Sequence, residues 1–338
     1  MRFAVFPVHQ ALGVMLAHSL ILADLSFKKG RHLSAADLDA LLAAGCTEVM
    51  GVRLEDGDVG EDQAAELIGG ALGGDHTRLA RAATGRANLF AQAAGLAVID
   101  RRRLDHLNAQ HEAVTVATIA PWAMVRPRQM LATVKIIPFA VARPVIDQCL
   151  AATAGGPLIA VAPFIERRVA MILTVLPGGK DGLLDKTLAS NRGRIEALGG
   201  EWRGERRCAH EVGALLESIG RSLLAGCDLL LIAGASATVD RADVVPAAIV
   251  AGGGVIDHYG MPVDPGNLTL LAHIGEVAVV GVPGCARSPK LNGLDWVLAR
   301  LMAGLAVGSG DITAMGVGGL LTEMRDRPLP RLGRAKRL

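Results

Sequence analysis

The stretch that decides the fold is residues 229–246, LLLIAGASATVDRADVVP. Five apolar residues typical of a buried strand run into a turn of small residues, and two aspartates, Asp240 and Asp243, follow just before a new helix. In open parallel sheets, ligands bind beyond the carboxyl ends of the strands, where the N-termini of the following helices also lie. This stretch therefore predicts a strand-end site in an α/β fold.

Four further segments rich in glycine or proline lie in the same half of the chain, at 176–180, 260–267, 281–290 and 316–319. Each marks an exit from, or a turn between, predicted elements. So many turns of this kind within one half of the chain indicate the rim of a single site.

Strand-like and helix-like segments alternate from residue 169 onward. Apolar runs at 169–176, 229–233 and 277–282 predict buried strands, and periodic patterns at 184–198, 210–226 and 244–251 predict helices. A last helix is predicted to begin with Ser288 as its N-cap and Pro289 in its first turn. The alternation predicts an α/β domain of three layers, with a mostly parallel sheet covered by helices on both faces.

The first 150 residues predict an α+β region. Ser34 and Asp37 form a capping box before a leucine stripe that stops at Gly45, which predicts a helix. Residues 61–112 are predicted to be mostly helical, and the β-branched runs of 113–142 to form strands. We expect an N-terminal α+β region at 1–150, with an inserted or separate small domain at 60–150, an α/β domain at 155–322 and a basic tail at 323–338. The tail is either solvated or an anion-binding arm.

The composition of the chain excludes several classes of function. With 35 basic and 33 acidic residues among 338, the formal charge is +2, so no global field attracts nucleic acid or an anionic membrane. Five scattered cysteines without a CxxC pair argue against a disulfide framework and a zinc cluster, and fit a reducing compartment. Neither a signal peptide nor a membrane-spanning helix is predicted. We expect a cytoplasmic protein that forms a dimer or trimer.

Acidic side chains at the strand exits are candidates for catalysis. Asp240 and Asp243 are suited to hold a magnesium ion or a hydroxyl group, and the small residues between 234 and 238 leave backbone N–H groups open to an anion. Asp243 also stands where a helix N-cap belongs. Asp185, which we expect to open the helix at 184–198, is either a site residue or a complement to the helix dipole.

Two other turns carry candidate binding residues. In YGMPVDPGN, Asp264 and Asn267 are polar tips on a backbone that Pro265 and Gly266 constrain, which a rigid surface turn explains equally well. In GVPGCARSPKLNG, a predicted helix start at Ser288 lies between Arg287 and Lys290, which favours an anion site. Cys285 has no His partner in a recognised pattern, so the sequence does not favour it as a nucleophile.

The order of these turns resembles the molybdopterin-binding domain shared by the MoeA and MogA families of molybdenum cofactor biosynthesis. The pieces GASATVDRADVVP, MPVDPGN and GVPGCARSP follow the family's order over residues 155–321. Asp243 resembles the aspartate of the family's arginine-aspartate-valine-threonine-proline stretch, and Asp185 the aspartate that opens the preceding helix. The chain departs from the family's Gly-Gly at Gly234-Ala235 and from its PGNP at 283–286.

The N-terminal segments FPVHQALGVMLAHSL and KKGRHLSAADLDALLAAGCTEV, over residues 6–52, resemble the opening of MoeA more loosely. The whole chain is most similar to a MoeA-related group that also occurs fused to molybdenum cofactor cytidylyltransferase domains. Such a domain is absent from the sequence, and the resemblance implies it as a separate partner.

The resemblance implies a site built from particular residues. Asp243 with Asp240 would hold Mg²⁺, and Asp185 would act with them. The cofactor-binding residues it implies are Gly234, Ala235, Ser236, Ala237, Pro265, Gly266, Asn267, Pro283, Gly284, Arg287, Ser288 and Lys290. Molybdopterin would be the ligand or substrate, with ATP or molybdate as a further reactant.

Three functions follow as hypotheses. The first is a transferase in Mg²⁺-dependent nucleotidyl transfer to molybdopterin or in molybdenum insertion. The second is a non-catalytic module that presents molybdopterin or its nucleotide form to a cytidylyltransferase or a molybdoenzyme. The third is a nucleotide pyrophosphatase of the CinA type, since CinA-type proteins contain a related domain.

Overall fold

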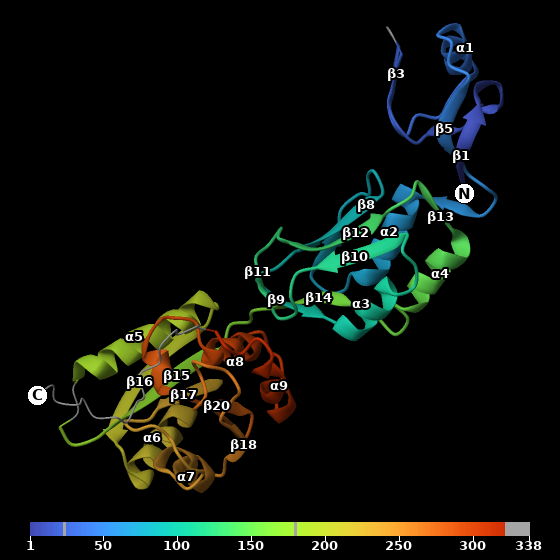
Figure 1. The fold of residues 1–338 in the computed structure, drawn as a ribbon. Coiled ribbons are helices and arrows are strands. Elements are labelled where there is room, and N and C mark those ends of the chain that lie inside the picture. Colours follow the sequence, from blue (N-terminus) through green and yellow to red (C-terminus); the bar gives the residue numbers. More distant parts are fainter. Residues whose placement is uncertain (23–24, 179–180, 322–338) are drawn as a thin grey trace, which may run out of the picture. The chain divides into compact units, whose positions relative to one another are not determined.

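The computed structural model describes residues 1–22, 25–178 and 181–321 (Figure 1). The chain divides into two compact units, the first from Met1 to Pro163 and the second from Phe164 onward. The predicted basic tail and Lys180 lie outside the described residues. Among the described residues, the helices are too short or too polar to cross a membrane.

The first unit begins with a small antiparallel sheet in the order β1-β5-β2. These strands are β1 (Arg2–Pro7), β5 (Glu48–Arg53) and β2 (Met15–Leu16), and beside them are the hairpin of β3 (Leu20–Leu22) with β4 (Leu25–Phe27) and helix α1 (Ala35–Ala43). The predicted capping box is confirmed, because Ser34 Oγ accepts from the Asp37 N–H and the Asp37 carboxylate accepts from the Ser34 N–H. Phe6, Leu16 and Leu41 belong to the core of this part.

The rest of the first unit packs three helices and three more sheets around one apolar cluster. The sheets have the orders β10-β12-β8-β7, β11-β9-β14 and β13-β6. The strands are β6 (Asp58–Gly60), β7 (Thr77–Leu79), β8 (Arg86–Ala91), β9 (Gly95–Ile99), β10 (Val114–Thr118), β11 (Met124–Val125), β12 (Met130–Ile136), β13 (Ala140–Ala142) and β14 (Ile159–Pro163), and the helices are α2 (Glu61–Leu72), α3 (Arg101–Asn108) and α4 (Arg143–Ala151).

The prediction that residues 61–112 are mostly helical was wrong. Helix α2 ends at Leu72, before Gly73 and Gly74, and three strands follow before α3 begins. In β8 the residues alternate between partly or fully exposed and buried, with Ala87, Leu89 and Ala91 facing the core. This period of two is typical of a half-buried strand and not of a helix.

The second unit is built on one six-stranded sheet with the order β16-β15-β17-β20-β19-β18. Its strands are β15 (Arg168–Val175), β16 (Glu201–Ala209), β17 (Leu229–Ala233), β18 (Val255–Tyr259), β19 (Leu270–Ile274) and β20 (Val277–Gly281). Strands β16, β15, β17 and β20 are parallel, whereas β19 is antiparallel to both of its neighbours. The predicted mostly parallel sheet is therefore confirmed.

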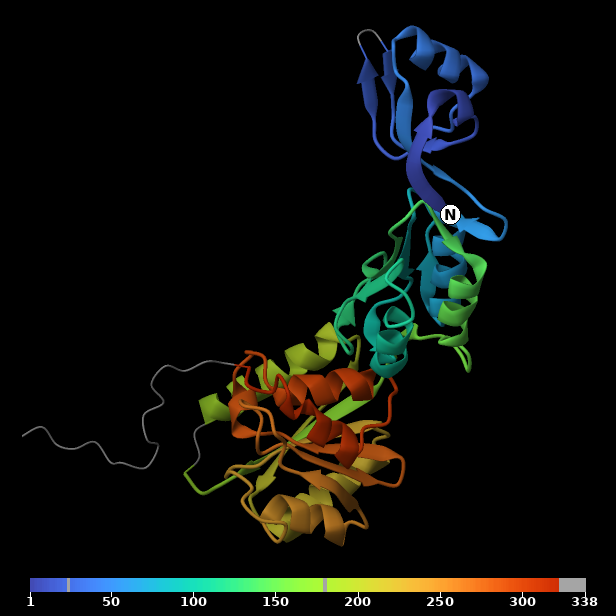
Figure 2. The same cartoon turned by 45° about the vertical axis from the view of Figure 1, so that its right-hand side comes forward.

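Helices cover both faces of this sheet, which makes the three-layer α/β fold. Helices α6 (Val212–Leu224) and α7 (Val244–Ala251) lie on one face, and α5 (Asp181–Ala197) and α8 (Gly293–Met302) lie on the other, with the short α9 (Ser309–Thr313) beside β18 (Figures 1 and 2). Strand β17 is buried along most of its length because it is covered on both sides. Its bounds and those of α7 agree with the sequence prediction.

Two helix starts differ from the prediction. Helix α8 begins after Asn292, whose side chain accepts from the Leu294 N–H, and not at Ser288; residues Gly284–Arg287 form a 3-10 turn, η2, instead. Asp295 completes a capping box with Asn292, which is a stronger start signal than a serine before a proline. Helix α5 already includes Asp181, so Asp185 lies in its second turn and does not open it.

Candidate functional site

Three parallel strands end side by side at one edge of the sheet. The register pairs Leu173 with Ala233 and Ile232 with Gly281, so the segments after β15, β17 and β20 start next to one another. A pocket of about 370 Å³ lies there. It is lined by Ile232, Gly234, Ala235, Ser236, Ala237, Thr238, Val245, Leu268, Gly281, Val282, Pro283, Gly284 and Arg287. Two of the segments that the sequence singled out, after β17 and after β20, thus contribute to one pocket.

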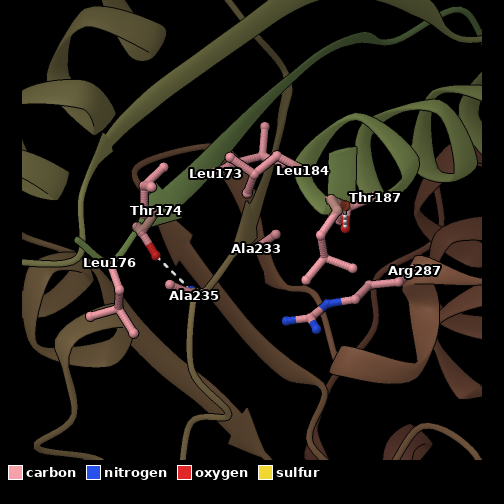
Figure 3. A pocket seen from close by; sticks show the side chains of 11 residues that line it. Leu173, Thr174, Leu176, Leu184, Thr187, Ala233, Ala235 and Arg287 are labelled. Carbon is pink, nitrogen blue, oxygen red and sulfur yellow. Dashed lines mark hydrogen bonds between the residues drawn. The ribbon is translucent and has the colours of Figure 1, made fainter. Parts of the chain in front are cut away.

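A smaller pocket of about 130 Å³ adjoins it and shares Gly234, Ala235 and Arg287 with it (Figure 3). Its remaining lining is mostly apolar: Leu173, Thr174, Val175, Leu176, Leu183, Leu184, Thr187 and Ala233. Within the described chain, neither pocket is lined by an aspartate or a glutamate. The two pockets together therefore provide a polar part and an apolar part, and the lining described for each contains no carboxylate.

Arg287 stands where the two pockets meet. Its guanidinium points toward Ala235, across the pocket (Figure 3). The structure gives the guanidinium no hydrogen bond or ion pair with any of residues 1–22, 25–178 and 181–321. A half-buried guanidinium in this state is available to a carboxylate or phosphate of a ligand.

Backbone N–H groups of the turn after β17 add to this polar surface. The Ala235 N–H is already used, because it donates to Thr174 Oγ1 at 2.8 Å. The N–H groups of Ser236, Ala237 and Thr238 donate to no acceptor in the described part of the chain. Three successive unpaired N–H groups beside a guanidinium can bind an anion.

Thr174 is a buried polar residue near the end of β15, directly after the apolar run of residues 169–173. Its Oγ1 lies 2.8 Å from His210 Nδ1 and also accepts the Ala235 N–H. If the Thr174 hydroxyl donates to Nδ1, all three groups are satisfied. Thr174 therefore fixes the first residues of the turn that lines both pockets. The sequence reasoning missed it, although a lone hydroxyl near the end of a buried strand was a visible signal.

Asp240 and Asp243 close the far part of this turn. Asp243 Oδ1 accepts from the Val244 N–H at 2.7 Å and Oδ2 from the Val239 N–H at 3.1 Å, while Asp240 Oδ1 accepts from the Ala242 N–H at 2.7 Å. Asp243 is therefore the N-cap of α7, as one of its two predicted roles required. Neither carboxylate lines a pocket described above.

Tyr259 lies within electrostatic reach of both aspartates. Its hydroxyl donates to the Thr238 carbonyl at 2.7 Å, so the phenol touches the same turn. Burial raises the pKa of Tyr259 above its ordinary 10.0, and the negative charges of Asp243 and Asp240 raise it further. Within the described residues, no three or more His, Cys, Asp or Glu side chains form a cluster suited to a metal ion.

The turn with Pro265, Gly266 and Asn267 lies outside both pocket linings. The Pro265 carbonyl accepts from the Gly293 N–H at 2.8 Å, and the Asn267 carbonyl accepts from the Met261 N–H at 2.9 Å. Leu268, directly after it, lines the larger pocket. Pro265 and Gly266 thus lie against the start of α8, and Asn267 closes the turn onto Met261. These contacts agree with the alternative of a rigid turn.

Ser288 and Lys290 also lie outside the linings. Their carbonyls accept from Arg194 Nη2 at 2.6 and 3.1 Å, and the Lys290 N–H donates to Ser288 Oγ. Asp185 accepts from Arg207 Nη2 at 2.6 Å on an exposed part of α5. Burial raises the pKa of the Cys285 thiol, which lowers its thiolate fraction.

Comparisons of the sequence with family models and with curated proteins give two findings. The family described as Domain of unknown function (DUF8806) matches residues 5–53. No curated protein matches the sequence.

Solved structures similar to this chain include three proteins of molybdenum cofactor biosynthesis. A molybdenum cofactor biosynthesis protein from Pyrococcus furiosus is 12% identical with a TM-score of 0.25, over 93% of this chain and 65% of that one. The molybdopterin biosynthesis MoeA protein from Pyrococcus horikosii is 14% identical with a TM-score of 0.32, over 89% and 75%. A molybdopterin biosynthesis protein from Mycobacterium abscessus is 14% identical with a TM-score of 0.30, over 41% and 92%. The chain thus spans slightly less than two thirds of the P. furiosus protein.

Proposed function

We propose that the second unit binds molybdopterin, or its nucleotide form, and acts in molybdenum cofactor biosynthesis. The observation that carries this proposal is the pocket of about 370 Å³ lined mainly by residues 234–238, residues 281–284 and Arg287. These are two of the segments whose order in the chain resembles the MoeA and MogA families. The activity of the protein, its substrates and its partners are all part of this proposal.

The terminal phosphate of the ligand would occupy the polar pocket. Its oxygens would accept from the N–H groups of Ser236, Ala237 and Thr238, and from the guanidinium of Arg287. The absence of a carboxylate from the described lining favours a dianion there. The adjoining apolar pocket leaves room for the less polar part of such a ligand.

A magnesium ion would be held by Asp240 and Asp243. The donor set fits this ion in part: both residues are carboxylates on one turn, and a carboxylate that accepts one N–H per oxygen keeps further lone pairs. Mg²⁺ commonly binds through one or two carboxylates, several waters and substrate phosphates. When bound, it would neutralise phosphate charge during nucleotidyl transfer or release.

A second candidate function is a binding module that presents molybdopterin to a cytidylyltransferase or a molybdoenzyme. The observation that favours it is the use of both aspartates in closing their own turn. Carboxylates occupied in this way are less free to serve a reaction. In this second function, Arg287 and the turn N–H groups keep the role given above.

One experiment separates the two functions. The purified protein is incubated with molybdopterin, ATP and Mg²⁺, with or without molybdate, and bound pterin, adenylylated pterin and inserted molybdenum are measured. Arg287→Met should weaken pterin binding by about 10-fold or more, because a hydrogen bond to a charged group contributes about 1.5–3 kcal/mol. Arg192→Met is the matched control, since Arg192 pairs with Glu196 on an exposed part of α5.

The substitution Asp243→Asn decides between enzyme and module. If the protein is a transferase, Asp243→Asn should keep pterin binding and lose turnover. If it is a binding module, both the wild type and Asp243→Asn should bind pterin, and neither should show turnover. The protein is also assayed with ADP-ribose and Mg²⁺. Hydrolysis of ADP-ribose would favour the hypothesis of a nucleotide pyrophosphatase. Failure of the wild-type protein to bind or convert molybdopterin would contradict the proposal.

A further inference from the structure

Arg194, on α5, is a buried charge that the site described above does not use directly. It is 9% exposed. All of its N–H donors have acceptors: Nε donates to Asp295 Oδ1 at 2.7 Å, Nη1 to Ser190 Oγ at 2.7 Å and to the Ala286 carbonyl at 3.0 Å, and Nη2 to the Ser288 carbonyl at 2.6 Å and the Lys290 carbonyl at 3.1 Å. The side chain therefore has no free donor for a ligand.

Three of these acceptors are carbonyls on either side of Arg287. Ala286 precedes it, and Ser288 and Lys290 follow it. The segment's other bonds come mostly from residues near it in the chain: the Ala286 N–H donates to the Pro283 carbonyl at 2.9 Å, the Ser288 N–H to the Cys285 carbonyl at 3.2 Å, and Asn292 Nδ2 to the Lys290 carbonyl at 3.2 Å. Among the described side chains that bond to the backbone around Arg287, Arg194 reaches the most carbonyls, three in all.

Asp295 and Asn191 hold that guanidinium and the segment in place. Asp295 accepts from Arg194 and, with its other oxygen, from the Asn292 N–H at the start of α8. The fully buried Asn191, one turn before Arg194, donates to the Ala286 carbonyl at 3.3 Å. A single network therefore connects α5, the segment 286–290 and α8.

We propose that Arg194 is a positioning residue that sets the direction of the Arg287 guanidinium and so determines the affinity of the pocket for a phosphate group. The inference rests on the proposed function only for its ligand. A planar guanidinium can span three carbonyls and a carboxylate, whereas a lysine ammonium is a point charge with three donors. In Arg194→Lys the charge stays, some carbonyls lose their donors, and Arg287 is no longer held in one direction.

The test measures binding of two probes, inorganic phosphate and molybdopterin, to the full chain by calorimetry. Arg194→Lys and Arg287→Met should each weaken phosphate binding by about 10-fold. Because Arg194 acts through Arg287, the double variant should bind no more weakly than Arg287→Met alone. Arg192→Lys, two residues away on the exposed side of α5, is the control and should bind as the wild type does.

A purely structural role makes a different prediction. In that case Arg194→Lys lowers the free energy of unfolding, measured with urea, while phosphate affinity of the folded protein stays unchanged. The positioning role is also overturned if the double variant loses phosphate affinity by the product of the two single-variant factors. Asp295→Asn is the second variant, in case Arg194→Lys does not fold: it removes the charge that orients Arg194 and should weaken phosphate binding by less than 10-fold. Wild-type affinity in Asp295→Asn then overturns the proposal.

The two probes keep the proposals apart. Wild-type binding of phosphate that depends on Arg287, without binding of molybdopterin, rejects the proposed function and leaves the Arg194 test intact. Binding of both probes with no effect of Arg194→Lys rejects only the positioning role. If the wild type binds neither probe, both are rejected.

Discussion

The hydroxyl of Thr174, at the end of β15, accepts the backbone N–H of Ala235, the second residue after β17, at 2.8 Å. This bond joins the ends of two neighbouring parallel strands. Ala235 lines both pockets and Thr174 lines the smaller one. The bond also explains why the anion donors of this turn begin at Ser236.

The substitution Thr174→Val should destabilise the second unit. It removes the acceptor of the Ala235 N–H and the partner of His210 Nδ1 while almost preserving the side-chain volume. A buried polar group left without its partner costs about 1–3 kcal/mol. The free energy of unfolding from urea titration measures this loss, and Thr174→Ser, which keeps the hydroxyl, should recover most of it. Equal stability of the Val and Ser variants would show that the bond contributes nothing.

The sequence predicted the local parts of the site and missed those made at long range. Strand β17 and helix α7 agree with the predicted bounds, because a buried apolar run and an aspartate N-cap act over a few neighbouring residues. The start of α8 was misplaced at Ser288, although the capping box of Asn292 and Asp295 was a local signal visible in the sequence. The sequence could not show that Arg194, 94 and 96 residues earlier in the chain, holds the carbonyls of Ser288 and Lys290. No local pattern announces such a contact. In contrast, the alternation in β8 was visible in the sequence and was misread.

Stability of the second unit should fall in acid through Asp228. Its carboxylate receives hydrogen bonds from the Arg168 side chain and backbone N–H, and the pKa of Asp228 is lowered from 3.8 to about 2, mainly by the side-chain bond. Because the folded pKa lies below the unfolded one, this stabilisation is complete above about pH 4 and is lost as the pH falls toward 2. Asp228→Asn should therefore be less stable than the wild type at neutral pH, with a difference that shrinks in this window. A difference that is constant down to pH 2 would contradict the assignment.

Gly266 should be required for packing. It has φ +141°, and an added Cβ would lie 2.7 Å from the Gly293 nitrogen and 2.9 Å from its Cα. Gly266→Ala therefore forces the turn away from the start of α8, and we expect a loss of about 1–3 kcal/mol in the free energy of unfolding. Gly220→Ala is the matched control, because this position in the middle of α6 is open and the change should stabilise the helix by about 0.5–1 kcal/mol. A Gly266→Ala protein of normal stability but impaired pterin binding would instead favour a direct role at the site.

Tyr259 offers a direct test of magnesium binding, because it is the only tyrosine in the chain and its phenolate absorbance reports one group. Burial and the charges of Asp243 and Asp240 raise its pKa. A magnesium ion on these carboxylates would offset their negative charge, so alkaline titration with Mg²⁺ should give a lower Tyr259 pKa than titration without it. Asp243→Asn should also lower this pKa, while keeping an N-cap, and should reduce the further effect of Mg²⁺. If the wild-type titration is the same with and without Mg²⁺ at matched ionic strength, the two aspartates hold no magnesium in the free protein, and their role is to close the turn and cap α7.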